Sequence, residues 1–176
     1  VRDGQWWRTV TALALHSDGL HLFSNVLFAA PFFIMLAQRI GLGMALLTSL
    51  MSGALGNACD VVYRDPGYAS IGASTAMFGI VGLLCADIVV RSSERGLRRL
   101  ALPVAAGMAF LAMLGAEGQN IDYAAHVFGL ACGFFLGLPV ACCAAKMCGG
   151  IWTQFALGTI GALTVLLCWC LAFNTL

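Results

Sequence analysis

Long apolar stretches alternate with short polar segments along this chain. Six of the stretches are long enough to be membrane-spanning helices, because about 20 apolar residues in a helix cross a bilayer. Lipid offers the backbone no hydrogen-bond partner, so each stretch is expected to be a helix that satisfies its own amides. The pattern therefore predicts an all-α polytopic membrane protein whose spans cover residues 20–37, 41–59, 71–86, 100–116, 123–145 and 151–173.

Composition and charge support these spans and orient them. Hydrophobic residues make up 61% of the chain and charged residues 10%, with a mean hydropathy of +0.92, which excludes an ordinary soluble domain. Threading the six spans in order gathers basic residues into alternate loops, opposed there only by Glu94: Arg39, Arg91, Arg95, Arg98, Arg99 and Lys146. The positive-inside rule places those loops in the cytoplasm. The beginning of the chain and residues 72–79 then face outward.

Neither a disulfide framework nor a metal site is expected. Most of the eight cysteines fall within the predicted spans, where a thiol packs as a small apolar side chain. The sequence has no CxxC pair and no His-Glu-x-x-His segment, which disfavours structural zinc and a zinc protease. Acidic residues are not paired inside the spans, which disfavours an aspartyl protease or a proton-coupled transporter.

A serine among small residues, Ser74, opens the third predicted span. That span carries a stripe of small residues at helical spacing, and the fifth span carries a second stripe that follows His126. The two stripes are Thr75, Gly79, Gly82 and Ala86, and Gly129, Gly133 and Gly137. Small residues let two helices approach closely. Packing the two stripes together predicts that Ser74 lies near His126.

His21 and Asn25 add polar groups at the same level of the membrane. They are four residues apart in the first predicted span, so they share one helix face. A serine becomes a nucleophile when an imidazole accepts its proton, and the attacked carbonyl then needs hydrogen-bond donors for its oxyanion. Ser74 and His126 are candidates for the reacting pair. His21, Asn25 and the backbone amide of Ser74 are candidates for the donors.

Each of these residues has a simpler explanation when it is taken alone. A serine between small residues commonly bonds back to a helix carbonyl. His16 and His21, close to a span end, are suited to facing lipid headgroups or bracing a loop. Asn25 and His126 are harder to explain in this way, because a buried unpaired amide costs several kcal/mol and the histidine precedes a glycine stripe.

A third catalytic residue is not evident. Asp87 lies thirteen residues beyond Ser74, or about 20 Å along a helix, and is expected at the cytoplasmic edge. Asp122 is four residues before His126 but is expected outside the membrane. The residues together therefore favour a Ser–His dyad.

Four motifs give the chain a resemblance to the rhomboid intramembrane serine proteases. They agree with that family in order and spacing over nearly the whole chain, and jointly they are specific: Trp7-Arg8, His21-Leu22-Phe23-Ser24-Asn25, Gly72-Ala73-Ser74-Thr75 and Ala125-His126-Val127-Phe128-Gly129. The resemblance implies a rhomboid-like helical bundle. It also implies attack by the serine on a peptide bond near the outer end of a substrate's transmembrane helix.

The resemblance assigns a role to each matching residue. Ser74 would be the nucleophile and His126 the general base and then the general acid. The oxyanion would be bound by His21, Asn25 and the Ser74 backbone amide. Support of the site falls on three further residues: Gly72, which keeps the serine segment open, Phe78, which stands where the family commonly packs a tyrosine on the histidine, and Gly129.

The same resemblance sets the expected organisation and partners. Residues 1–176 would form a single rhomboid-like membrane domain, with 1–19 the end of an outer loop, 20–145 the catalytic core helices and 151–173 an extra C-terminal helix. The resemblance also leads us to expect one more helix upstream, and the polar run at residues 16–19 separately predicts a turn over residues 9–20. Ala37-Gln38-Arg39 stands where the family often has a glutamate.

The leading functional hypothesis is an intramembrane serine endopeptidase that cleaves transmembrane-helix substrates near the outer face of a bacterial inner membrane. Its expected partners are transmembrane protein substrates and the lipid bilayer, with no nucleic acid, no cofactor and no metal. The alternative is a catalytically inactive rhomboid-like protein that binds transmembrane helices for quality control or trafficking. Such relatives typically lack the serine or the histidine, and this chain has both.

Overall fold

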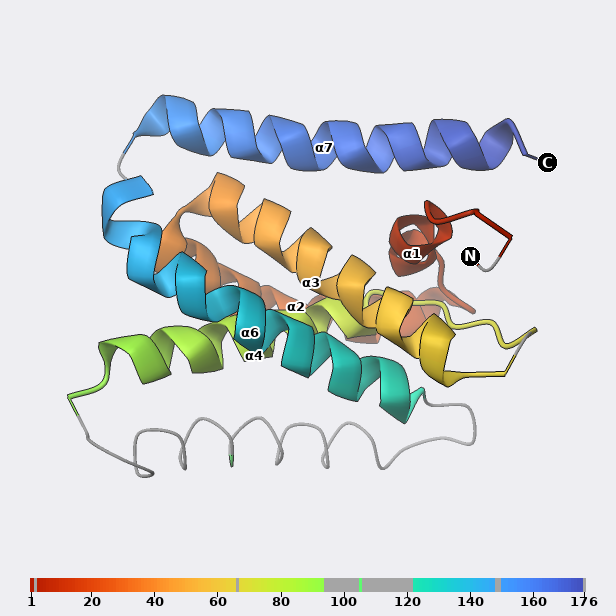
Figure 1. The fold of residues 1–176 in the computed structure, drawn as a ribbon, viewed down its shortest axis with the longest axis horizontal. Coiled ribbons are helices and arrows are strands. Elements are labelled where there is room, and N and C mark those ends of the chain that lie inside the picture. The colour runs from red at the N-terminus through yellow and green to blue at the C-terminus, as the bar shows by residue number, and fades with distance from the viewer. Residues whose placement is uncertain (2, 66, 94–104, 106–121, 148–149, 176) are drawn as a thin grey trace.

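The regular structure of the described residues is helical (Figure 1). The computed structural model describes the whole chain except residues 2, 66, 94–104, 106–121, 148–149 and 176. The helices in chain order are α1 (Arg8–Thr11), a 3₁₀ turn η1 (Ala12–Ala14), α2 (Gly19–Ile40), α3 (Leu42–Tyr63), α4 (Ser74–Arg91), α6 (Tyr123–Met147) and α7 (Ile151–Phe173).

Among the described residues, five helices are long and apolar enough to cross a membrane: α2, α3, α4, the 123–143 part of α6, and α7. They confirm five of the six predicted spans, and the sixth, 100–116, lies outside the described residues. The third span begins later than predicted, at Ser74 rather than at residue 71. The reason is Gly72, whose φ of +125° is incompatible with a right-handed helix.

The prediction that residues 9–20 form a turn is wrong in its first half. The chain is helical over α1 and η1, because the apolar side chains of Val10 and Leu13 are buried against the bundle. Burial of such a face stabilises a short helix that local propensity alone does not. A turn remains at residues 15–18, where Asp18 accepts a hydrogen bond from the His21 amide at 2.8 Å and so caps α2.

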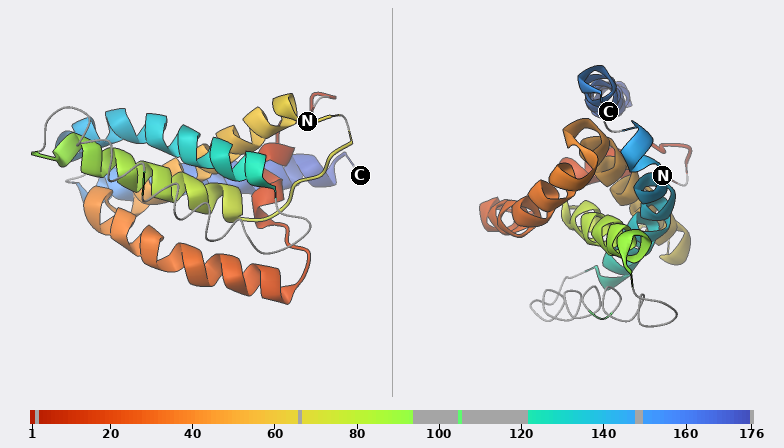
Figure 2. Two further views of the ribbon diagram at one scale, coloured as in Figure 1. Left: turned by 90° about the horizontal axis from the view of Figure 1, so that it is seen from below. Right: turned by 90° about the vertical axis from the view of Figure 1, so that its left-hand side faces the viewer.

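The close contact between α4 and α6 organises the bundle. The two helices cross in Figure 1 and lie side by side when seen from below in Figure 2. A Cβ placed on Gly82 would overlap the carbonyl oxygen of Leu130, and one on Gly133 would overlap that of Gly79. The predicted packing of the two small-residue stripes is therefore confirmed.

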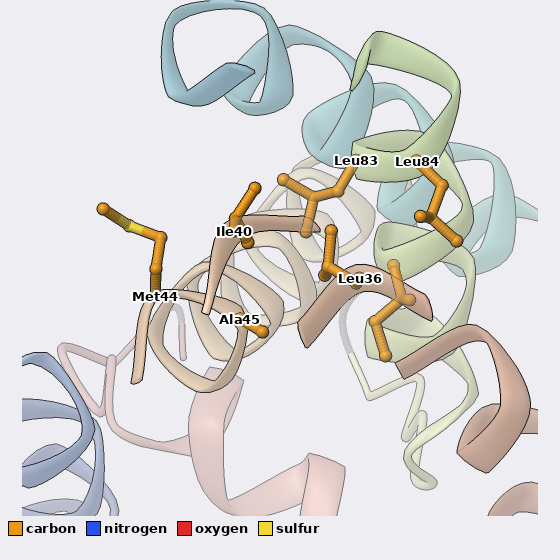
Figure 3. Packing of buried hydrophobic residues seen from close by; sticks show 7 residues of the cluster. Leu36, Ile40, Met44, Ala45, Leu83 and Leu84 are labelled. Atoms are coloured by element: carbon orange, nitrogen blue, oxygen red, sulfur yellow. The ribbon is translucent and has the colours of Figure 1, made fainter. Parts of the chain in front are cut away.

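A hydrophobic cluster joins three helices around the middle of α4. Its side chains come from α2, α3 and α4 (Figure 3): Leu36, Ile40, Met44, Ala45, Ile80, Leu83 and Leu84. Near this cluster the buried carboxylate of Asp87 pairs with Arg39 at 2.8 Å and with Arg91 at 2.6 Å. Asp87 is thus a structural ion-pair partner remote from the histidine, as its spacing from Ser74 predicts.

Helix α7 packs along α3 on the outside of the bundle, apart from α4 and α6 (Figures 1 and 2). Its polar anchor is Gln154, whose amide accepts from the Met44 N–H at 3.1 Å and donates to the Ile40 carbonyl at 3.2 Å. Groups of this kind, at the end of α2 and the start of α3, lack partners within their own helix, and Gln154 supplies them. Gly43 permits this contact, because a Cβ there would overlap the Gln154 carbonyl.

Candidate active site

Ser74 and His126 lie in hydrogen-bond contact. Ser74 is the first residue of α4, and its Oγ is 2.9 Å from Nε2 of His126 in the first turn of α6. The backbones are close enough for this because Gly129 packs directly on Thr75, whose carbonyl a Cβ at 129 would overlap. The predicted proximity of the serine and the histidine is confirmed.

The imidazole of His126 is held by stacking. The Phe78 ring lies one helical turn below Ser74, with its centroid 4.4 Å from that of the imidazole and an interplanar angle of 26°. Both side chains are buried. Within the described part of the chain, Nδ1 of His126 has no hydrogen-bond partner, and the carboxylate of Asp122 bonds to other groups. Among the described residues the imidazole therefore contacts Ser74 and Phe78, and the catalytic dyad stays a prediction.

Gly72 places His21 and Asn25 beside the serine. Its amide donates to the Ala12 carbonyl at 3.0 Å, which holds Gly72 against η1. The described residues 65 and 67–73, which lie between α3 and α4, are here called the serine loop. A Cβ on Gly72 would lie 2.9 Å from Nε2 of His21 and 3.6 Å from Nδ2 of Asn25. Both nitrogens therefore face the space beside the loop, two residues before Ser74.

The partners of His21 indicate which tautomer the neutral ring adopts. Its Nδ1 accepts from the Ser17 amide at 3.4 Å and lies 3.1 Å from the Ser17 hydroxyl. Because an amide only donates, neutral His21 carries its proton on Nε2, the nitrogen that faces Gly72. The Asp18 carboxylate accepts from the His21 amide and the Ser17 hydroxyl, and these bonds hold the pKa of Asp18 below its usual range.

Asn25 supplies a second donor. The residue is buried, and its Nδ2 makes no hydrogen bond to any part of the chain that the structure describes. An unpaired buried amide is costly, which makes Nδ2 of Asn25 a candidate donor to a group bound beside Gly72. Next to it, the first amides of α4, including that of Ser74, have no acceptor within their helix.

His16 and Ser17 belong to this site although the sequence did not single out their contacts. Nε2 of His16 accepts from the Ala73 amide at 3.4 Å, and its ring meets that of His21 edge to face at 5.1 Å. His16 therefore braces the serine loop, one of the two explanations that its position allowed. The polar run that precedes α2 is the signal in the sequence, and the partners depend on the fold.

Comparison with known proteins supports the resemblance to the rhomboid family that the four motifs indicate. A family model described as the Rhomboid domain matches residues 3–142, which excludes α7. The rhomboid-family protein YdcA of Bacillus subtilis is 32% identical over 136 residues, 77% of this chain and 68% of the relative. Rhomboid-like protease 3 of Toxoplasma gondii is 33% identical over 141 residues, 78% of this chain and 51% of the relative.

A third relative, rhomboid protease GluP of Bacillus subtilis, is 32% identical over 145 residues, 80% of this chain and 28% of the relative. The chain therefore spans about half of the Toxoplasma protein and less of GluP. No solved structure gives a significant match. The family model covers most of the chain, including all four motifs, and the chain belongs to the rhomboid family.

Proposed function

We propose that this protein is an intramembrane serine endopeptidase that cleaves transmembrane-helix substrates with a Ser–His dyad. The observation that carries the proposal is the 2.9 Å contact between Ser74 Oγ and His126 Nε2. Two nitrogens that lie beside Gly72 support the second requirement, a place for the oxyanion: Nε2 of His21, and Nδ2 of Asn25, which has no partner among the described residues.

The first half of the reaction acylates the serine. Oγ of Ser74 attacks the carbonyl carbon of the scissile peptide while its proton passes to Nε2 of His126. The carbonyl oxygen becomes an oxyanion that accepts hydrogen bonds from His21 Nε2, Asn25 Nδ2 and the Ser74 amide. When the C–N bond breaks, His126 gives its proton to the leaving amine, and an ester to Ser74 remains.

The second half hydrolyses that ester. Water loses a proton to Nε2 of His126 and attacks the ester carbonyl, and the same donors bind the second oxyanion. The C–O bond to Ser74 then breaks, and the proton on His126 returns to Oγ. A cavity of about 710 Å³, lined in part by Ser70 and Ile71 of the serine loop, offers water a place near the site.

Substrate class and membrane orientation belong to the same proposal. The five described apolar helices support a multi-pass membrane protein, so the substrates are transmembrane helices presented within the bilayer. The positive-inside rule, applied to the basic loops, favours an orientation with Ser74 toward the outer face of the membrane, and the proposed membrane is the inner membrane of a bacterium. The contacts of Gln154 support residues 1–176 as one membrane domain that includes α7.

The test is cleavage of a model single-span substrate by the purified protein in liposomes, with the products identified by mass spectrometry. The proposal predicts one main cut near the outer end of the substrate helix and no cut by Ser74→Ala. Undiminished cleavage by that variant would refute the proposal. Binding of the substrate without any cleavage by the unaltered protein would instead support the alternative, an inactive rhomboid-like protein that binds transmembrane helices.

A further inference from the structure

Arg64 lies where three segments around the candidate site meet. It directly follows α3, and Nε of its guanidinium is 3.5 Å from the buried carboxylate of Asp60 in that helix. Its Cζ lies 4.3 Å from the ring centroid of Tyr68 in the serine loop. Its Nη2 lies 2.7 Å from Oδ1 of Asp122, the residue before α6. One side chain thus contacts α3, the serine loop and the start of α6.

Asp122 also forms hydrogen bonds with the first turn of α6, the helix that carries His126. Its Oδ1 also accepts from the Ala125 amide at 3.1 Å, and its carbonyl accepts from the His126 amide at 3.2 Å. Burial tends to raise the pKa of Asp122, but the Ala125 amide, Arg64 and the nearby Ser70 hydroxyl lower it further than burial raises it. The group is therefore a carboxylate at neutral pH, so the contact with Arg64 is an ion pair.

The residues in these contacts lie close in sequence to the two residues that would react. Ser70 and Asp122 stand four residues before Ser74 and His126, respectively. A shift of Asp122 relative to the serine loop therefore moves the first turn of α6 relative to the first turn of α4. A misplacement of about 1 Å is enough to cost on the order of a hundredfold in rate.

We propose that Arg64 and Asp122 are positioning residues whose ion pair holds the serine loop against the first turn of α6. By this contact the pair keeps Ser74 and His126 at hydrogen-bond distance. The hydrogen bonds given above for Asp122 join it to Arg64, to the Ser70 hydroxyl and to the backbone of α6 rather than to the imidazole ring. The effect of this ion pair on catalysis rests on the proposed proteolytic function.

The first arm of the test is a double-mutant cycle on the full chain with the single-span substrate. Arg64→Gln and Asp122→Asn are each expected to lower kcat about tenfold to a hundredfold, with KM changed less than about twofold. Asparagine at 122 keeps an oxygen that caps α6, so folding is retained. The double variant is expected to be no slower than the slower single variant, because all three lack the same ion pair. Asp65→Asn, an exposed carboxylate in the same loop, is the matched control and should leave kcat unchanged.

The second arm measures backbone amide hydrogen exchange, which needs no activity. Both single variants are expected to speed exchange in residues 68–76 and 122–128 together, whereas Asp65→Asn changes neither segment. Losses of kcat that multiply in the double variant, or faster exchange in only one segment, would overturn the proposal. A lowered melting temperature of the single variants with an unchanged kcat would also overturn the proposal. If the unaltered protein cleaves no substrate, but exchange becomes faster in both segments of the single variants, the structural contact is supported and the proposed proteolytic function is refuted.

Discussion

Asn25 offers the sharpest prediction, because its Nδ2 has no hydrogen-bond partner among the described residues. Substitution Asn25→Ala removes a donor that pairs only when an oxyanion forms beside Gly72. Loss of one oxyanion donor costs about 2.7–4 kcal/mol of transition-state stabilisation, or a factor of about 10²–10³ in kcat. Since Nδ2 has no partner among the described residues, its removal breaks no hydrogen bond in that part of the protein. The free energy of unfolding is therefore expected to change little or to rise.

A second buried asparagine gives the matched control. Nδ2 of Asn57 donates to the Thr9 carbonyl at 2.9 Å and ties α3 to α1. Asn57→Ala leaves that carbonyl unpaired, which costs about 1–3 kcal/mol of stability, and it should change kcat of the folded protein far less than Asn25→Ala does. The assay is kcat on a single-span substrate beside thermal unfolding in the same detergent. If Asn25→Ala loses as much stability as Asn57→Ala and keeps its kcat, the assignment of an oxyanion donor is wrong.

Three further outcomes are expected. Gly72→Ala should reduce cleavage at least tenfold, because its Cβ would lie 2.9 Å from Nε2 of His21 at a φ that only glycine adopts readily; full activity would contradict the geometry. Asp122 has a lowered pKa when folded, so the stability it contributes with Arg64 should be complete above about pH 4 and lost as pH falls through the lower folded value. Unfolding of the unaltered protein and of Asp122→Asn should accordingly converge in acid, and a constant difference would refute the ion pair. Gln154→Ala removes two hydrogen bonds and should lower the free energy of unfolding by about 2 kcal/mol, measured by thermal melts; an unchanged melt would show that α7 is held by apolar packing alone.

The sequence predicts the helices and the central pair well, for a physical reason. Apolar length and small-residue stripes are local signals, and two such stripes have one obvious way to pack, which brings Ser74 to His126. The spacing of His21 and Asn25 is likewise a property of a single helix. These features needed no knowledge of distant contacts.

The contacts that support the site are harder to predict, because each joins segments far apart in the chain. Arg64 and Asp122 are 58 residues apart, and neither belongs to a periodic pattern. The brace of His16 on the Ala73 amide requires the serine loop to be in place. Residues 8–14 fold as helices because the bundle buries Val10 and Leu13, a consequence of tertiary structure that local propensity does not contain.

The central claim is that His126 activates Ser74 for nucleophilic attack. The most direct measurement is intact-mass analysis of the protein after treatment with a fluorophosphonate, whose phosphorus is attacked by an activated serine Oγ with loss of fluoride. The account predicts one adduct on Ser74, none on Ser74→Ala, and labelling of His126→Ala slowed by orders of magnitude. Labelling of His126→Ala at the rate of the unaltered protein, or no adduct on the folded unaltered protein, would contradict it.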